Sequence, residues 1–238
     1  MRSKTSFSYI EIYIARFLKV MKIALLFGSS GLVGGHLLNQ LIKDINYSKI
    51  KLFVRSDAEI SDPKVEIIKT DFTNLQNHKE DIKGDDCFVC IGTTKKNSPD
   101  KDEYKRVELD IPKEIAKIAK SNLVNSFIFV SALYANPKSS GDYVRFKGLV
   151  EQELKELNFP KLGIMRPSFL IGNRKEKRVG EKIGIFVFKL LSPLLLGPLK
   201  KMKPIHSETV AKAMIRAANE NLEKNVFESS EIDKLVLN

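Results

Sequence analysis

The sequence predicts a single α/β domain built on a mostly parallel sheet. From Met21 onward, short β-branched runs alternate with helical patterns, which is typical of parallel strands joined by right-handed crossovers. At 238 residues the chain is long enough for one such domain and too short for two of ordinary size. Its 43% hydrophobic and 29% charged residues exclude collagen-like, disordered and disulfide-scaffold classes.

Seven strands are predicted, each from a short apolar run. They are Lys22-Phe27, Lys51-Arg55, Glu66-Lys69, Cys87-Ile91, Phe127-Val130, Leu162-Met165 and a last one near Asn225-Glu228. The helices between them carry apolar stripes that we expect to face the sheet. The first helix carries Val33, Leu37, Leu38, Leu41 and Ile42 on its apolar stripe. Pro112 starts or bends the second helix, and a third helix runs from Tyr143 to Leu157. Ser207 is expected to cap the last helix, which carries Val210 and Met214.

A glycine-rich turn follows the first strand directly and opens the first helix. It reads Gly28-Ser29-Ser30-Gly31-Leu32-Val33-Gly34. Glycines permit a tight turn and let the backbone approach a pyrophosphate, whose charge free N–H groups at the helix N-terminus stabilise. In a strand-turn-helix unit this spacing indicates a dinucleotide site in a Rossmann fold, a doubly wound sheet in three α/β/α layers with a small C-terminal substrate-side segment. A merely structural turn is the alternative.

The end of the second strand favours NADP(H) over NAD(H). An NAD site usually presents an acid there for the ribose 2′-hydroxyl, but this strand ends in Arg55, whose guanidinium would pair with a 2′-phosphate. Asp57 keeps NAD open, and a solvated surface arginine is the alternative for Arg55.

The order of these pieces, from Lys22 to about Asn219, resembles the atypical short-chain dehydrogenase/reductase family. The resemblance rests on the Gly28 turn, Asp71-Phe72, Ile91-Gly92-Thr93-Thr94 and Arg166-Pro167, each after a strand. Within that family the chain is most similar to the Tat-interacting-protein-like NADPH-binding oxidoreductases, through Cys90-Ile91-Gly92-Thr93-Thr94-Lys95 and Tyr143-x-x-x-Lys147-Gly148. The resemblance implies that Asp71 and Phe72 frame the adenine, and that Gly92, Thr93 and Pro167 line the cofactor cleft. Plain turn chemistry is the alternative, above all for Phe72.

By the same resemblance, Tyr143 and Lys147 form the catalytic pair. Spacing alone carries little weight, because Tyr-x-x-x-Lys also occurs at Tyr47 and Tyr134. Tyr47 lies at the entry to the second strand, far from the expected nicotinamide, and Pro137 forbids a regular helix after Tyr134. Tyr143 and Lys147 begin a helix, so their i, i+4 spacing puts both on one face. A packing tyrosine and a solvated lysine are the alternative.

The expected chemistry is acid-base catalysis during hydride transfer. A tyrosine hydroxyl titrates near pH 10, and a nearby cation such as Lys147 favours its phenolate, so Tyr143 can exchange a proton with a carbonyl oxygen. Lys147 would also bond the nicotinamide ribose. The family's third residue is a serine just after the fifth strand, and either Ser131 or Ala132 takes that position. We predict Ser131; with Ala132 the site lacks a donor and catalysis is in doubt.

The predicted function is an NADP(H)-dependent oxidoreductase that acts on a small carbonyl or alcohol. Residues 168–204 contain a basic loop and the apolar stretch Ile183-Leu199 and are expected to form a substrate-side lid. The apolar stretch is too short and too broken for a membrane span. Its basic flanks keep contact with an anionic membrane surface open. The alternatives are a non-catalytic NADPH-binding regulator and a peripheral membrane protein with a Rossmann core.

Composition and minor motifs add four expectations. The formal charge of +11 is spread lysine rather than clustered arginine, so we expect no nucleic-acid partner. The three histidines have no ligand spacing, so no metal is expected.

Cys87 and Cys90 lie three residues apart in a predicted buried strand, so their side chains face opposite sides of the sheet and lie about 10 Å apart. This distance is too long for a disulfide, and we expect both to be core residues of a reducing, cytoplasmic protein. Residues 1–20 are expected to be a dispensable extension.

Overall fold

The computed structural model describes residues 21–172 and 202–237 and contains all seven predicted strands. The first, β1, has the predicted bounds, while β2 begins four residues before the predicted Lys51, at Tyr47. The strands of the main sheet are β1 (Lys22–Phe27), β2 (Tyr47–Val54), β3 (Val65–Lys69), β4 (Asp86–Val89), β5 (Ser126–Val130), β6 (Lys161–Arg166) and β9 (Val226–Glu228).

These strands are all parallel and follow the order β3-β2-β1-β4-β5-β6-β9. The chain runs outward from β1 to β3 and then crosses to β4 on the other side of β1. In open sheets of this kind, ligands bind at the carboxyl ends of the strands near this switch point. The order therefore confirms the predicted Rossmann fold class. A separate short pair, β7 (Leu170–Ile171) and β8 (Ile205–His206), lies outside this sheet.

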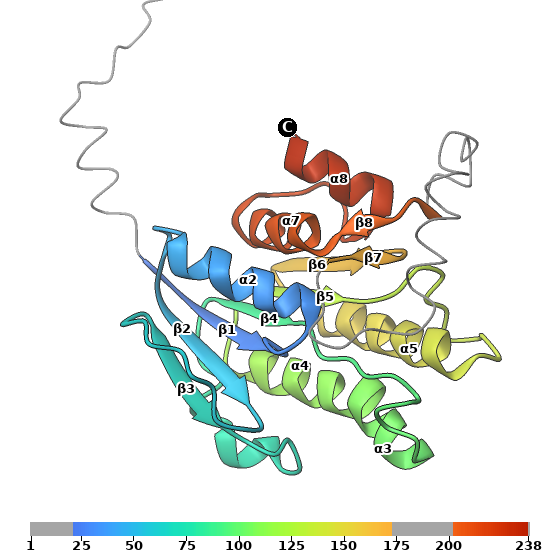
Figure 1. Ribbon diagram of the computed structural model, residues 1–238, viewed down its shortest axis with the longest axis horizontal. Coiled ribbons are helices and arrows are strands. Elements are labelled where there is room, and N and C mark those ends of the chain that lie inside the picture. The colour runs from blue at the N-terminus through green and yellow to red at the C-terminus, as the bar shows by residue number, and fades with distance from the viewer. Residues whose placement is uncertain (1–20, 173–201, 238) are drawn as a thin grey trace, which may run out of the picture.

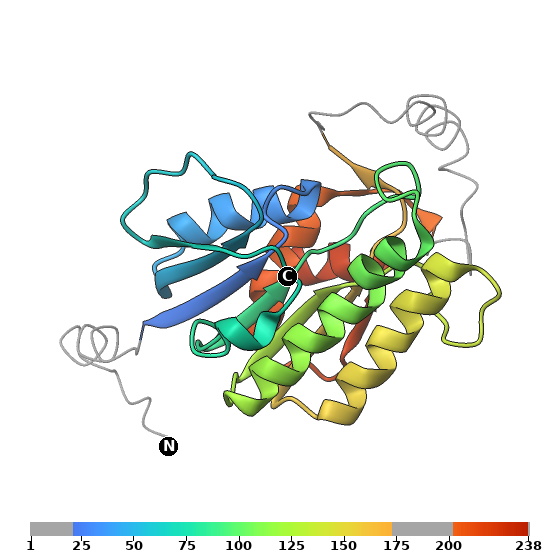
Figure 2. The ribbon, with the colours of Figure 1, turned by 90° about the horizontal axis from the view of Figure 1, so that it is seen from below.

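Helices cover both faces of the sheet (Figures 1 and 2). They are α2 (Leu32–Lys43), α3 (Lys101–Lys105), α4 (Ile111–Ser121), α5 (Asp142–Leu157), α7 (Ser207–Asn219) and α8 (Ser229–Leu237), with a 3-10 turn η1 (Leu75–His78) and a π-helical turn η2 (Arg106–Asp110). Helices α2, α7 and α8 lie on one face, and α4 and α5 on the other (Figure 1).

Each face has its own hydrophobic core. Leu37 and Met214 belong to the core beneath α2 and α7, and Ile115 and Val150 to the core beneath α4 and α5. The predicted stripes therefore do face the sheet. Cys87 is buried in the α4/α5 core while Cys90 packs against the α2/α7 core, and both are free thiols. This confirms that the two thiols face opposite sides of the sheet and form no disulfide, although β4 ends at Val89, so Cys90 follows the strand and the predicted end at Ile91 is two residues too late.

One predicted helix start is wrong and another is confirmed. Ser207 is the first residue of α7 rather than its cap, because His206 holds the N-cap position and the Ser207 hydroxyl donates to the Ile171 carbonyl, 3.2 Å away. Pro112 lies near the start of α4, as expected, but the backbone before it is already helical in α3 and η2.

The predicted extension at residues 1–20 and most of the predicted lid, residues 173–201, lie outside the described part of the chain. Among the helices that the structure does describe, none combines the length and the apolar character needed to cross a membrane.

Candidate functional site

The predicted cofactor residues all follow strands at the carboxyl edge of the sheet. The glycine turn follows β1, Arg55 follows β2, Asp71 and Phe72 follow β3, Gly92 and Thr93 follow β4, and Pro167 follows β6. Tyr143 and Lys147 lie in the first turns of α5, which the chain reaches after β5. The parallel sheet thus gathers segments that are far apart in sequence along one edge.

The glycine turn is closed by contacts that leave no room for side chains. Gly28 has φ of +87°, and a Cβ there would lie 2.7 Å from the carbonyl carbon of Cys90. A Cβ on Gly34, in the first turn of α2, would lie 2.1 Å from the Gly28 oxygen. In the described structure, no side chain bonds the amides at the start of α2, whose N-cap is Gly31. A bare backbone cradle with free N–H groups at a helix N-terminus fits a diphosphate.

The end of β2 presents an exposed cation. Arg55 and Ser56 are exposed directly after the strand, and the predicted contact of Arg55 with a ribose phosphate stays a prediction. The competing acid, Asp57, is held by Lys69 at the end of β3, with 2.9 Å between the ammonium and the carboxylate. Arg55 also acts electrostatically on Glu103, and Arg106 donates hydrogen bonds to the same carboxylate. The acids Asp57 and Glu103 at this end of the sheet are therefore each paired with a cation.

Asp71 and Phe72 make the contacts of a tight turn. The Asp71 carboxylate accepts hydrogen bonds from the Thr73 amide (2.8 Å) and hydroxyl (2.7 Å), and these bonds lower the pKa of Asp71. Phe72 has φ of +63° and is buried, with its ring centroid 6.4 Å from that of Phe27. Turn chemistry accounts for both residues in the free protein, and their predicted place beside an adenine stays a prediction.

Tyr143 and Lys147 differ sharply in exposure although they are one helical turn apart. The Tyr143 side chain is exposed, while Lys147 is only 2% exposed. The Lys147 ammonium donates to the Ile91 carbonyl (3.3 Å), lies 4.8 Å from the Phe129 ring centroid, and pairs with Glu108 at 2.9 Å. Burial by itself would lower the pKa of Lys147, but Glu108 and then Tyr143 outweigh it, and the pKa is raised above its ordinary value. Lys147 is therefore a buried cation that interacts electrostatically with Tyr143.

Glu108 is a site residue that the sequence analysis missed. It lies in η2, is fully buried, and accepts the Thr93 amide proton at 2.6 Å besides pairing with Lys147. It thereby joins Thr93, which follows β4, to Lys147 in α5. A lone glutamate within a helical pattern ordinarily indicates a solvated face, so no local signal in the sequence could identify it.

Ser131 makes contacts that differ from those expected of a catalytic serine. Its side chain is buried, and its hydroxyl donates to the Glu151 carboxylate at 2.5 Å. Glu151 also accepts from Arg166 at 2.8 Å, and Arg166 in turn donates to the Ala135 carbonyl at 3.0 Å. The structure thus brings Ser131 to an ion pair between α5 and β6. Ala132, in the alternative position, has no donor to offer.

The two rejected Tyr-x-x-x-Lys pairs lie as predicted. The Tyr47 hydroxyl donates to Asp86 at 2.7 Å, and Tyr47 and Asp86 begin β2 and β4, at the amino edge of the sheet. Burial and the Asp86 carboxylate raise the pKa of Tyr47 far above its ordinary value, so it cannot serve as a base. Tyr134 is an exposed residue with φ of +61° in the loop after β5, outside any helix.

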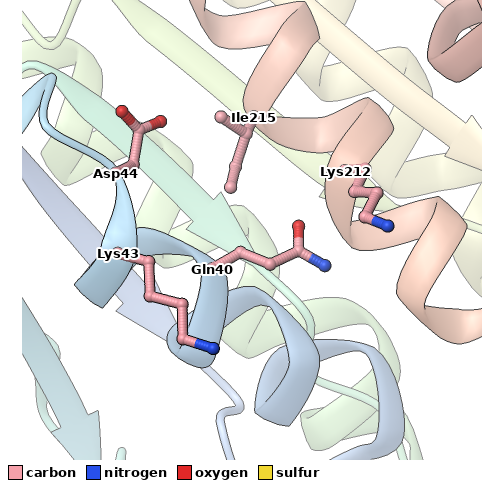
Figure 3. Close-up of a pocket in the computed structure, with 5 residues that line it drawn as sticks. All are labelled: Gln40, Lys43, Asp44, Lys212 and Ile215. Atoms are coloured by element: carbon pink, nitrogen blue, oxygen red, sulfur yellow. The ribbon is translucent and has the colours of Figure 1, made fainter.

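A shallow depression lies between α2 and α7, away from these residues. It has a volume of about 290 Å³ and is lined by Gln40, Lys43, Asp44, Lys212 and Ile215 (Figure 3). Its α2 residues come from the last turn and the C-cap, at the opposite end of that helix from the glycine turn. The depression therefore does not belong to the candidate cofactor site.

Comparison with known proteins agrees with this geometry. The model of a family described as NAD(P)H-binding matches residues 28–221. Protein FMP52-1, mitochondrial, of Scheffersomyces stipitis is 30% identical over 210 residues, which cover 84% of this chain and 90% of that protein. Protein HTATIP2 of Rattus norvegicus is 30% identical over 164 residues, 67% of each chain. The fold is similar to that of the Bordetella bronchiseptica enzyme WbmH, solved with NAD+ (TM-score 0.68, 16% identity, 91% of this chain and 79% of that one).

Proposed function

The chain belongs to the NAD(P)H-binding family of atypical short-chain dehydrogenase/reductase type, and from this premise we propose that it is an NADP(H)-dependent oxidoreductase acting on a small carbonyl or alcohol. The supporting observation is the pair formed by an exposed Tyr143 and a buried, cationic Lys147 on one face of α5. From α5, the Lys147 ammonium donates to the carbonyl of Ile91, in the loop after β4. Gly92 and Thr93, which would line the cofactor cleft, follow directly in that loop.

Each residue of the proposed site has one task. Amides of the Gly28–Gly34 turn bind the diphosphate, and Lys147 holds the nicotinamide ribose and interacts electrostatically with Tyr143. Tyr143 passes a proton to or from the carbonyl oxygen, which is worth roughly 10²- to 10⁴-fold in rate. The nicotinamide, when bound, supplies or accepts the hydride.

A two-stage experiment tests this function. NADPH and NADH are first titrated into the protein by calorimetry. A panel of aldehydes and ketones is then added with the reduced form of the preferred coenzyme, and a panel of alcohols with its oxidised form, while the absorbance of the reduced coenzyme is followed. We expect NADPH to bind more tightly and at least one carbonyl class to be reduced. Tight NADPH binding with no turnover on any carbonyl or alcohol would overturn the enzymatic proposal.

Replacement of Arg55 tests the proposed coenzyme preference. A charge-assisted hydrogen bond to a 2′-phosphate is worth about 1.5–3 kcal/mol, so Arg55→Ala should weaken NADPH binding roughly 10- to 100-fold. NADH lacks that phosphate and should bind Arg55→Ala as it binds the wild type. Lys49→Ala, which removes an exposed cation near the amino end of β2, is the matched control for net charge. Equal loss for both coenzymes would contradict a role in discrimination.

A non-catalytic NADPH-binding regulator is the second candidate, and the contacts of Ser131 favour it. The hydroxyl expected to orient a carbonyl donates instead to Glu151, and Ala132 cannot replace it. Such a protein would bind NADPH and change its affinity for a partner protein without oxidising the coenzyme. The carbonyl panel distinguishes the two candidates.

Ser131→Ala tests whether this serine acts in turnover. Because its hydroxyl bonds a buried charged group, we expect the variant to lose about 1.5–3 kcal/mol of unfolding free energy. We expect its turnover to stay within about threefold of the wild type, since a positioned donor in direct contact with substrate would be worth roughly 10²-fold or more. Denaturant unfolding and steady-state kinetics measure the two effects. A hundredfold loss of turnover with unchanged stability would restore Ser131 to the catalytic set.

The place of the protein in the cell stays a prediction. Fungal relatives carry the word mitochondrial in their names, and that word describes those proteins alone. The two cysteines of this chain, expected to be reduced, favour the cytoplasm. The apolar stretch that kept membrane contact open lies outside the described residues.

A further inference from the structure

The helical segment that follows α3 widens into a π turn where it passes the candidate site. Residues Arg106–Asp110 form this turn, η2, between α3 and α4. Turns of this kind are rare and are found frequently at functional sites. Its central residue, Glu108, has a fully buried side chain. A buried carboxylate is unfavourable unless it is paired, so its partners identify what the π turn serves.

Both partners of Glu108 belong to the candidate site. One carboxylate oxygen accepts the Thr93 amide proton at 2.6 Å, and the other lies 2.9 Å from the Lys147 ammonium. Gly92 packs against the same groups, because a Cβ there would lie 3.4 Å from the carboxylate and 3.9 Å from the ammonium. A single side chain from η2 therefore fixes both the loop after β4 and the lysine of α5.

The pairing changes what Lys147 does to Tyr143. An unpaired ammonium would strongly favour the phenolate, whereas a carboxylate 2.9 Å from that ammonium cancels much of its field. We propose that Glu108 is a positioning residue of the candidate site, a buried counter-ion that holds Lys147 in place and keeps the Tyr143 hydroxyl protonated. This rests on the proposed function of Tyr143. A tyrosine that retains its proton is an acid, the form needed to reduce a carbonyl.

Other groups near this pair do not take over the role of Glu108. In the described residues, these groups include Cys90 after β4, Tyr104 on α3, and Tyr143 and Asp142 on α5, with Lys95 and Arg145 as partners of Asp142. Burial raises the pKa of Cys90 to about 12, and burial with Glu108 raises that of Tyr104 to about 12, so both are neutral at pH 7. The carboxylate of Asp142 is bound by Arg145 at 2.7 Å and lies 3.9 Å from Lys95.

Tyrosinate absorbance in the coenzyme-free protein tests the proposal. Because Tyr104 also interacts with Glu108, every variant carries Tyr104→Phe, and a parallel set with Tyr143→Phe identifies the signal of Tyr143 by difference. Glu108→Gln removes the charge but keeps the shape and an acceptor for the Thr93 amide. We expect the Tyr143 midpoint to fall by about one pH unit or more, since loss of a nearby like charge favours the phenolate. An unchanged or raised midpoint would overturn the proposal.

Two further variants make the result specific. Glu108→Asp keeps the charge and should return the midpoint to within about 0.3 pH unit of the reference protein, whereas a shift as large as that of Glu108→Gln would count against a charge effect. Asp102→Asn, which removes an exposed acid from α3, should leave the midpoint unchanged if solvent screens it. The titration needs neither coenzyme nor substrate. It can therefore fail while the proposed oxidoreductase activity stands, and it can succeed in a protein that turns over no carbonyl.

Discussion

Gly34→Ala is expected to abolish measurable NADPH binding, while Gly35→Ala, the same methyl group added one residue later, is expected to leave binding intact. A Cβ on Gly34 would lie 2.1 Å from the Gly28 oxygen and 2.8 Å from the Gly28 carbonyl carbon, distances that real atoms do not adopt. These contacts are backbone, so no side chain can turn away to relieve them. Either the start of α2 or the turn must move, and the amides proposed to bind the diphosphate move with it.

Gly35→Ala is a closely matched control for Gly34→Ala because both glycines lie in α2. A Cβ on Gly35 would lie 3.4 Å from the Ser29 oxygen, which is ordinary contact. Alanine is favoured over glycine inside a helix by about 1 kcal/mol, so Gly35→Ala should be slightly more stable than the wild type. For Gly34→Ala we expect an affinity lower by roughly a hundredfold or more, because a displacement of about 1 Å can cost that much.

Calorimetric titration with NADPH, together with circular dichroism to establish that each variant is folded, measures these effects. If Gly34→Ala is folded but less stable, a lower thermal midpoint reports the same clash. A folded Gly34→Ala protein that binds NADPH as the wild type does would show that the turn is structural and that the coenzyme lies elsewhere.

The strands and the glycine turn could be predicted because their signals are local. Strands β1, β4, β5 and β6 are short runs buried on both faces, and Gly28, Gly31 and Gly34 occur where a strand becomes a helix. What could not be predicted depends on contacts between distant residues. Strand β2 begins early, at Tyr47, whose hydroxyl bonds Asp86, 39 positions further along the chain. Ser207 fails as a cap because its hydroxyl bonds a carbonyl 36 positions away.

In the candidate site too, residues with a local sequence signal could be predicted and residues that depend on distant contacts could not. Tyr143 and Lys147 could be found because both lie on one helix with a spacing that has meaning there. Glu108 could not, since its partners Thr93 and Lys147 come from other segments and η2 has no sequence signature. Ser131 was identified by position alone. Its side chain bonds Glu151, a contact between a strand end and a helix that only the folded chain determines.

Tyr143→Phe is expected to lower turnover by roughly 10²- to 10⁴-fold while NADPH affinity changes by less than about threefold. The substitution removes only the hydroxyl from an exposed side chain, so the packing of α5 should be unaffected. Lys147 would be a poorer choice, because its removal leaves Glu108 buried without its cation, which typically destabilises a protein by about 3–5 kcal/mol. Lost activity in that variant could then reflect lost structure.

The matched control is Tyr134→Phe, which removes the same atom from another exposed tyrosine, in the loop between β5 and α5. We expect its turnover to stay within about threefold of the wild type if Tyr143 alone supplies the proton. Steady-state kinetics on the best carbonyl of the panel, with calorimetry for NADPH, separate the two variants. Full turnover by Tyr143→Phe would exclude the proposed acid. Retained NADPH binding with lost turnover only at position 143 would distinguish an enzyme from a regulator, because only an enzyme requires a proton at that hydroxyl.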